Sequence, residues 1–113
     1  MRETARRVLE TQGAPSSMEE LDLLIRTMRG HIELLVPEIS TLVAAAPPGD
    51  GPAICARIGA AEAVRRLRRT RGFDPDGVKR HATKLALSVL SLCDHSETLT
   101  RTAAAPPMAA AHS

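Results

Sequence analysis

The residues best suited to chemistry in this 113-residue sequence are Cys93, Asp94 and His95, which stand together and carry side chains that can ligate metal ions. His31 is a further candidate ligand. The surrounding pattern predicts a helix, on which residues two positions apart point about 160° away from each other. One ion therefore does not reach both Cys93 and His95, and no HExxH or CxxC spacing is present. We predict no metal site and no cofactor, with Cys93 buried and His95 hydrogen-bonded near the helix end.

The two cysteines, Cys55 and Cys93, show no spacing typical of a disulfide framework or a nucleophilic site. Cys55 lies near the start of a predicted helix, where the pKa of a thiol can fall. No paired base accompanies either thiol in the sequence, so we expect no catalysis and no catalytic residue. Two reduced thiols in a cytosolic protein are the interpretation that fits this usage.

Gly30 and His31 lie in the middle of a predicted helix, where glycine costs about 1 kcal/mol relative to alanine. Gly30 projects opposite the main apolar stripe, so it is either a tolerated surface glycine or the contact point of a partner helix. His31 borders the stripe and is expected to be a hydrogen-bonded boundary residue. His81, Ser88 and His95 recur every seven residues along one edge, which is either a pH-sensitive contact edge or, in the interpretation that we favour, a solvated helix flank.

Basic residues are concentrated in one segment although the net charge is only +2. Residues 57–84 hold nine basic and three acidic residues, whereas residues 17–50 hold two basic and six acidic ones. Complementation of a helix dipole, a nucleic-acid contact, or an acidic-to-basic contact between two protomers would each explain this layout. Phe73 is the only Phe, Trp or Tyr, so no aromatic stacking platform supports nucleic-acid binding. The basic run consists of Arg65, Arg66, Arg68, Arg69 and Arg71.

These residues sit on helices that the apolar spacing predicts. The longest helix spans residues 17–46 and starts at Ser16 or Ser17, because both Ser16 with Glu19 and Ser17 with Glu20 are typical of a capping box. Pro37 lies inside this pattern, which predicts either one kinked helix or two helices joined near Val36. Its apolar stripe recurs at alternating steps of four and three: Leu21, Ile25, Met28, Ile32, Leu35, Ile39 and Leu42.

Three further helices are predicted, over residues 2–12, about 52–70 and about 75–101. The third in the chain, 52–70, should pack through Ile54, Ile58, Ala61 and Val64. The fold class is therefore an all-α, small helical bundle of three long helices plus a short N-terminal helix, running up-down-up. We expect a short N-terminal helix and linker over residues 1–16, the bundle over 17–101, and a disordered Ala/Pro tail over 102–113. No apolar run is long enough for a membrane span and no secretory signal is present, so we expect a cytoplasmic protein.

Three segments resemble a family of small actinomycete proteins of unknown function, commonly labelled natural product biosynthesis proteins. The matching stretches are MRGHIELLVPEI, IGAAEAVRRL and SLCDHSETL, and the resemblance covers roughly residues 18–100. An aromatic residue often follows the last triplet, Cys93-Asp94-His95, in that family, whereas Ser96 stands there in this sequence. The resemblance implies an association with natural product biosynthesis and supplies no catalytic residue.

We interpret the sequence as a non-enzymatic accessory or protein-interaction protein with an unknown protein partner. The alternative is a weak nucleic-acid-binding regulator that uses the segment from Arg65 to Arg71, and a third is a small enzyme or ligand carrier with a pocket between helices. A homodimer is expected because Leu23, Leu34 and other leucines exceed what three helices can cover. The candidate interaction residues are Gly30, His31, Arg65, Arg66, Arg68, Arg69, Asp94 and His95.

Overall fold

The computed structural model describes residues 1–11, 17–69 and 74–104, and these form an all-α bundle of four helices. The helices are α1 (Arg2–Glu10), α2 (Met18–Ala45), α3 (Gly51–Arg68) and α4 (Pro75–Ala103). The prediction of one short N-terminal helix and three long helices is confirmed.

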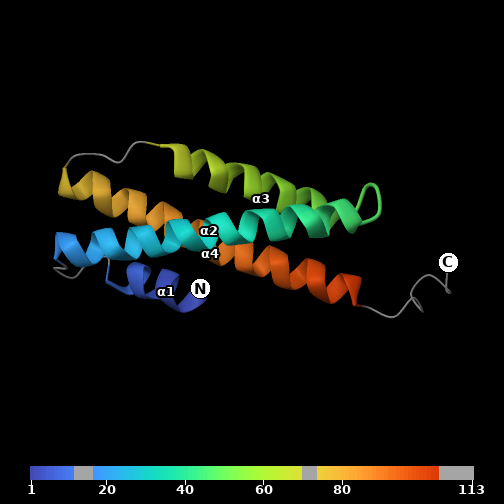
Figure 1. The fold of residues 1–113 in the computed structure, drawn as a ribbon, viewed down its shortest axis with the longest axis horizontal. Helices are drawn as coiled ribbons and strands as arrows, with labels where there is room; N and C mark the ends of the chain where they lie inside the picture. The colour runs from blue at the N-terminus through green and yellow to red at the C-terminus, as the bar shows by residue number, and fades with distance from the viewer. Residues whose placement is uncertain (12–16, 70–73, 105–113) are drawn as a thin grey trace.

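The two long helices α2 and α4 run parallel, and α3 runs antiparallel to both (Figure 1). Helices α1 and α3 lie on opposite sides of this central pair, so the molecule is elongated, with extents of 56 × 23 × 18 Å. The predicted up-down-up order is therefore what the structure shows. No helix in the described part of the chain is long and apolar enough to cross a membrane.

Helix α2 is one continuous element with Pro37 inside it, so the alternative of two helices joined near Val36 is wrong. Ser17 caps it, because its side chain accepts a hydrogen bond from the backbone N–H of Glu20 at 3.0 Å. Pro37 is exposed, on the side of α2 away from the core. The predicted stripe forms the core: Leu21, Ile25, Met28, Ile32, Leu35 and Ile39 are buried, and Leu42 packs against them half-buried.

Helix α3 packs through small side chains, and the predicted packing face is wrong. Its buried residues are Ala53, Ala56, Ala60 and Ala63. Ile54 and Ile58, which were expected to pack inward, are exposed. The alanines allow α3 to approach α2 and α4 closely. Because the alanine side of α3 faces inward, the larger aliphatic side chains on the opposite side of the same helix face outward.

Helix α4 starts after Asp74, whose side chain accepts from the backbone N–H of Gly77 at 3.1 Å, with Pro75 in the first turn. It ends at Ala103, so the first two residues of the predicted tail are helical and the bundle extends slightly past Arg101. The rest of that predicted tail, residues 105–113, lies outside the described residues, as does residue 70 at the predicted end of the third helix.

Candidate functional site

An apolar groove of about 380 Å³ lies between α2 and α3. Only Ser40 and Arg57 bring polar side-chain groups to its lining. The remaining lining residues are Val36, Ile39, Val43, Ala44, Ala60, Ala61 and Val64.

Large aliphatic side chains stand exposed on the two helices that form this groove. Leu34 on α2 is 65% exposed, and Ile58 and Ile54 on α3 are 60% and 40% exposed. Together with the groove, the two isoleucines define what we call the α2–α3 face. Leu34 stands two positions before the groove residue Val36 and therefore points about 160° away from it. Large apolar surface of this kind is typical of a binding site rather than of an ordinary solvated surface.

The chain has more leucines than the bundle buries, as the sequence indicated, because α1 leaves several of these side chains uncovered. Leu23, Leu34 and Leu87 are exposed, and Leu90 is half-buried. Leu34 and Gly30 project from α2 on the side opposite its buried stripe, and a Cβ on Gly30 would meet no atom within 4 Å. Gly30 therefore makes no close contact inside the molecule.

In the basic run that begins at Arg65, one arginine is bound within the bundle and other arginines are exposed. Arg66 is largely buried and donates to the Ser88 hydroxyl at 2.6 Å, to the Lys84 carbonyl at 3.0 Å and to Glu62 at 2.6 Å. It thereby fastens α3 to α4. The sequence interpretation of Ser88 as part of a solvated flank is wrong, since Ser88 and His81 are both buried.

The remaining arginines of that segment are available for external contacts. Arg65, Arg68 and Arg69 are exposed, and none of them forms an ion pair with another described residue. Arg71 lies outside the described residues. Of the four candidate interaction arginines, Arg65, Arg68 and Arg69 are thus free to meet a partner and Arg66 is not.

A second arginine clamp, which the sequence analysis missed, holds the end of α3 from the other side. Arg29 on α2 donates to the backbone carbonyl of Leu67 at 2.9 Å. That carbonyl belongs to the last turn of α3, where positive charge also complements the helix dipole. Only the fold brings the C-terminal turn of α3 beside Arg29.

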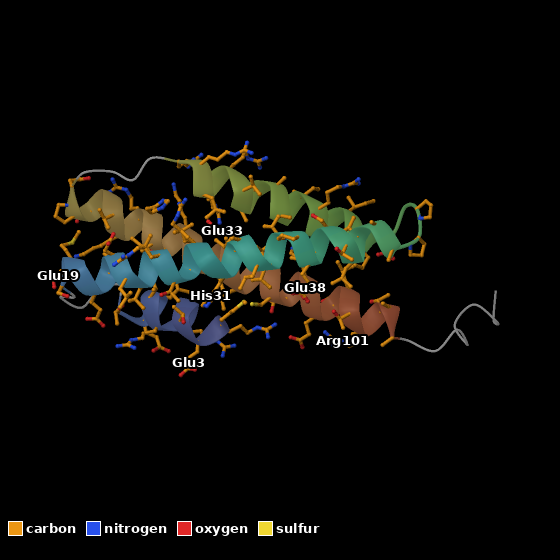
Figure 2. All side chains as sticks on the ribbon, in the orientation of Figure 1. Glu3, Glu19, His31, Glu33, Glu38 and Arg101 are labelled. Atoms are coloured by element: carbon orange, nitrogen blue, oxygen red, sulfur yellow. The ribbon has the colours of Figure 1, made fainter. Side chains whose placement is uncertain are left out.

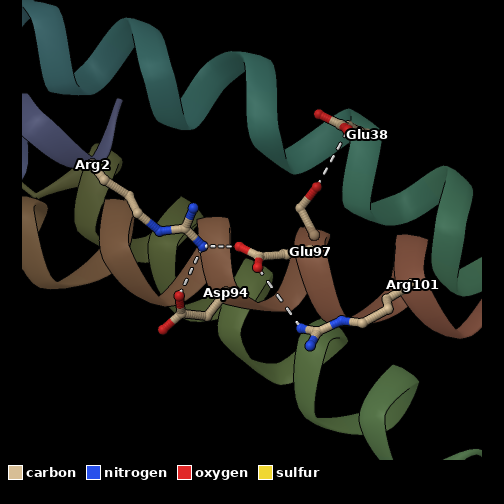
Figure 3. A network of polar contacts seen from close by, with 6 residues as sticks. Arg2, Glu38, Asp94, Glu97 and Arg101 are labelled. Atoms are coloured by element: carbon tan, nitrogen blue, oxygen red, sulfur yellow. Dashed lines mark hydrogen bonds and ion pairs between the residues drawn. The ribbon is translucent and has the colours of Figure 1, made fainter.

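Asp94 takes part in a polar network at the other flank (Figure 3). The guanidinium group of Arg2 on α1 donates to Asp94 at 3.0 Å and to Glu97 at 2.6 Å. Glu97 also lies 3.9 Å from Arg101, and the Ser96 hydroxyl donates to Glu38 at 3.2 Å. The acidic member of the predicted triplet therefore anchors the N-terminal helix.

His31 lies at the edge of α2 that faces α1, whereas Glu33 lies at the edge that faces α3 (Figure 2). The Nδ1 atom of His31 is buried and has no hydrogen-bond partner among the described residues. Burial lowers the pKa of His31, and the α-amino group of Met1 lowers it further. The expected hydrogen-bonded boundary histidine is therefore a half-buried ring with an unsatisfied nitrogen atom, which favours the neutral form.

His95 packs against α3 rather than toward Cys93. A Cβ on Gly59 would lie 3.0 Å from the Nε2 atom of His95, so Gly59 is the glycine that permits close contact between helices. Gly30, for which the sequence allows the same role, has no atom within 4 Å of a Cβ built on it. Cys93 lies toward α1, where burial raises the pKa of its thiol and the Arg2 guanidinium partly offsets the rise.

The candidate ligands thus do not converge. Within residues 1–11, 17–69 and 74–104, no group of three or more His, Cys, Asp or Glu side chains is placed to hold a metal ion. Cys55 is exposed and Cys93 is half-buried, on different helices. The site with the most coherent arrangement is the α2–α3 face, which is suited to binding another surface.

Comparison with known proteins gives one match. The sequence profile of a family described as "Family of unknown function (DUF6415)" matches residues 1–101, which includes all four helices except the last two residues of α4. No curated protein and no solved structure matches the chain.

Proposed function

We propose that this chain, which belongs to the family of unknown function DUF6415, is a non-enzymatic accessory protein that binds a partner protein through the α2–α3 face. The observation that carries the proposal is the exposure of Ile54 and Ile58 beside an apolar groove of about 380 Å³. Burying such side chains at an interface stabilises a complex by about 25 cal/mol for each Å² of apolar surface removed from water.

The face also has the mixed character of protein interfaces, in which an apolar centre is surrounded by charged side chains. Arg57 and Arg65 border it on α3 and Glu33 borders it on α2. We further propose a cytoplasmic protein of actinomycete origin that supports natural product biosynthesis. The resemblance of its MRGHIELLVPEI, IGAAEAVRRL and SLCDHSETL segments supports that part of the proposal.

The test is an affinity capture from the native host with the full chain as bait and Ile58→Glu as the variant. Leu87→Glu is the matched control, because Leu87 is also exposed but lies on α4. We expect at least one protein to be retained by the wild type and by Leu87→Glu and lost with Ile58→Glu. Identical capture by all three baits would contradict a binding role for the α2–α3 face.

A second candidate function, weak nucleic-acid binding, is favoured by the three exposed arginines Arg65, Arg68 and Arg69. Contacts of this kind go to phosphates, so affinity should fall steeply with salt and show no sequence preference. Duplex DNA retention measured over a salt series tests this alternative. Sequence-specific retention above physiological salt that disappears when the three arginines become glutamine would make nucleic-acid binding the main function.

A further inference from the structure

The α2–α3 face carries charges of opposite sign on its two helices. On α3, Arg57, Arg65 and Arg68 are exposed, and on α2, Glu33 is exposed. None of these four forms an ion pair with any residue that the structure describes. Exposed arginines on α3 and an exposed glutamate on α2, on the two sides of an apolar centre, allow such a face to bind a copy of itself.

The axial alignment of α2 and α3 is indicated by one contact and by the groove. At one level, Arg29 donates to the Leu67 carbonyl at 2.9 Å. Farther along the bundle, the end of the groove nearest Arg29 is lined by Val36 on α2 and by Val64 on α3, which gives a second, approximate level. Because the helices are antiparallel, residue numbers rise on α2 while they fall on α3 between these two levels.

Glu33 and Arg65 both fall between these two levels. Glu33 stands between Arg29 and Val36 on α2, and Arg65 stands between Val64 and Leu67 on α3. The two side chains are therefore at about the same height along the bundle, within one helical turn of about 5.4 Å. They belong to different sides of the face and are not paired with each other within one chain.

The two copies can be related by a two-fold axis that lies in the interface and runs parallel to the helices. Rotation about this axis leaves the height of each residue along the bundle unchanged. It places the α3 side of one face against the α2 side of the other. Each α3 then lies against the α2 of the other copy. Arg65 meets Glu33 of the partner subunit, and the reciprocal pair forms at the symmetry-related position. The same rotation buries Ile58, which is closer to the end of the groove that is farther from Arg29, against the partner's α2.

We infer that the α2–α3 face binds a second copy of this chain through this two-fold arrangement. The inference rests on the proposed function, because it names the partner for the same surface. Isologous two-fold dimers are the commonest soluble oligomers, and they require a self-complementary patch of the kind described here. The groove and the isoleucines of α3 supply the apolar centre, and the opposite charges fix the register.

The first experiment measures the mass of the purified full chain by sedimentation equilibrium over a concentration series. We expect a mass of two chains at high micromolar concentration, and a tenfold or greater weakening of the dimer in Ile58→Glu, about the effect of a buried interface residue. Leu87→Glu should dimerise like the wild type. A wild type that remains at the 12.1 kDa of one chain would overturn the inference, as would a dimer insensitive to Ile58→Glu.

A charge exchange then tests the geometry itself. Glu33→Arg should weaken the dimer because it places a cation opposite Arg65 of the partner subunit, and Arg65→Glu should weaken it by the reverse repulsion. The double variant restores opposite charges at both symmetry-related positions and should recover most of the lost affinity. A double variant that is no tighter than the weaker single variant would reject the proposed alignment.

The two proposals fail in different ways. A monomeric wild type whose capture of another protein depends on Ile58 would overturn the second copy as partner and leave the proposed function standing. A dimer sensitive to Ile58→Glu, combined with capture that is unaffected by it, would support the inference and remove the α2–α3 face as the binding site for another protein.

Discussion

Helices α3 and α1 lie on opposite sides of the central α2–α4 pair and are attached to it in different ways (Figure 1). Helix α3 packs through four buried alanines and is clamped at its C-terminal end by Arg66 and Arg29. Helix α1 buries only Ala5 and Val8.

The polar attachment of the two flanks differs as well. Helix α1 is joined to its neighbours by ion pairs between exposed or half-exposed groups, such as those of Arg2. Exposed ion pairs contribute little to stability and are screened by salt, whereas partly buried hydrogen bonds to charged groups contribute more. The α3 side is thus the rigid flank, and its alanine packing is also the reason that its isoleucines face outward.

The largest expected effect concerns the core that both flanks share. Leu92→Ala should lower the free energy of unfolding by about 2–5 kcal/mol, because Leu92 is fully buried and its loss leaves a cavity. Leu87→Ala is the matched control on the same helix and should stay within about 0.5 kcal/mol, because Leu87 is 48% exposed. Urea denaturation measures both. Equal losses would show that α4 packs with another face inward.

The next effect tests the α3 attachment. Arg66→Ala should cost about 1–3 kcal/mol, because it leaves the buried Ser88 hydroxyl and the Lys84 carbonyl without their charged donor. Arg65→Ala, one position away and exposed, should be nearly neutral in dilute protein. If the two variants unfold at the same urea concentration, Arg66 does not fasten α3, and the contrast between the two flanks loses its basis.

The sequence was sufficient to predict the helices, because their signals are local. The apolar spacing of α2, the Ser17 cap and the Asp74-Pro75 start each depend on residues within a few positions of one another. The sequence left open whether α2 continues through Pro37. Proline removes one backbone hydrogen bond, and packing along the entire helix, which no local pattern shows, offsets that loss. The exposure of Leu23 and Leu34 was predicted from a count of apolar faces and is confirmed.

The packing face of α3 could not be predicted from hydrophobicity, because that criterion favours Ile54 and Ile58 over the alanines that are in fact buried. The roles of Arg29 and Arg66 depend on atoms 38 and 22 residues away, which no local pattern indicates. Gly59 is a partial exception. Gly59 and Gly30 both lie inside predicted helices, which is a local signal of close approach, but nothing in the sequence distinguishes the glycine that meets a neighbouring helix from the one that does not.

The α1 attachment predicts a smaller, salt-dependent effect. Arg2→Gln should weaken the docking of α1, because it removes the ion pairs to Asp94 and Glu97. Hydrogen exchange of the α1 amides should accelerate at low ionic strength and approach the wild-type rate at high salt, where the wild-type pairs are themselves screened. Arg6→Gln is the control, because Arg6 is exposed and unpaired within the described residues. Faster exchange throughout α3 in Arg2→Gln would contradict independent attachment of the two flanks.

The smallest effect is a pH dependence confined to the α1 side. Burial lowers the pKa of His31 in the folded protein below the ordinary histidine value of about 6.5 found in the unfolded chain. As the pH falls through that value, the unfolded chain takes up a proton that the folded chain resists, so the unfolded state is favoured. The stability associated with neutral His31 is therefore fully present above the unfolded pKa and is lost as the pH falls toward the folded pKa.

His31→Gln removes this titration while leaving the other ionisable groups in place. Between about pH 7.5 and about pH 5.5, on either side of the ordinary histidine pKa, the wild type should lose more stability than His31→Gln does. The excess loss should be accompanied by faster hydrogen exchange in α1, because a protonated His31 lies near the Met1 amino group and repels it. The amides of α3, held by the alanine packing and by Arg66 on the opposite side of the pair, should respond equally in both proteins. A pH response of α3 that depends on His31 would show that the two flanks are coupled through α2, and a response absent from α1 would place the His31 ring outside the contact between α1 and α2.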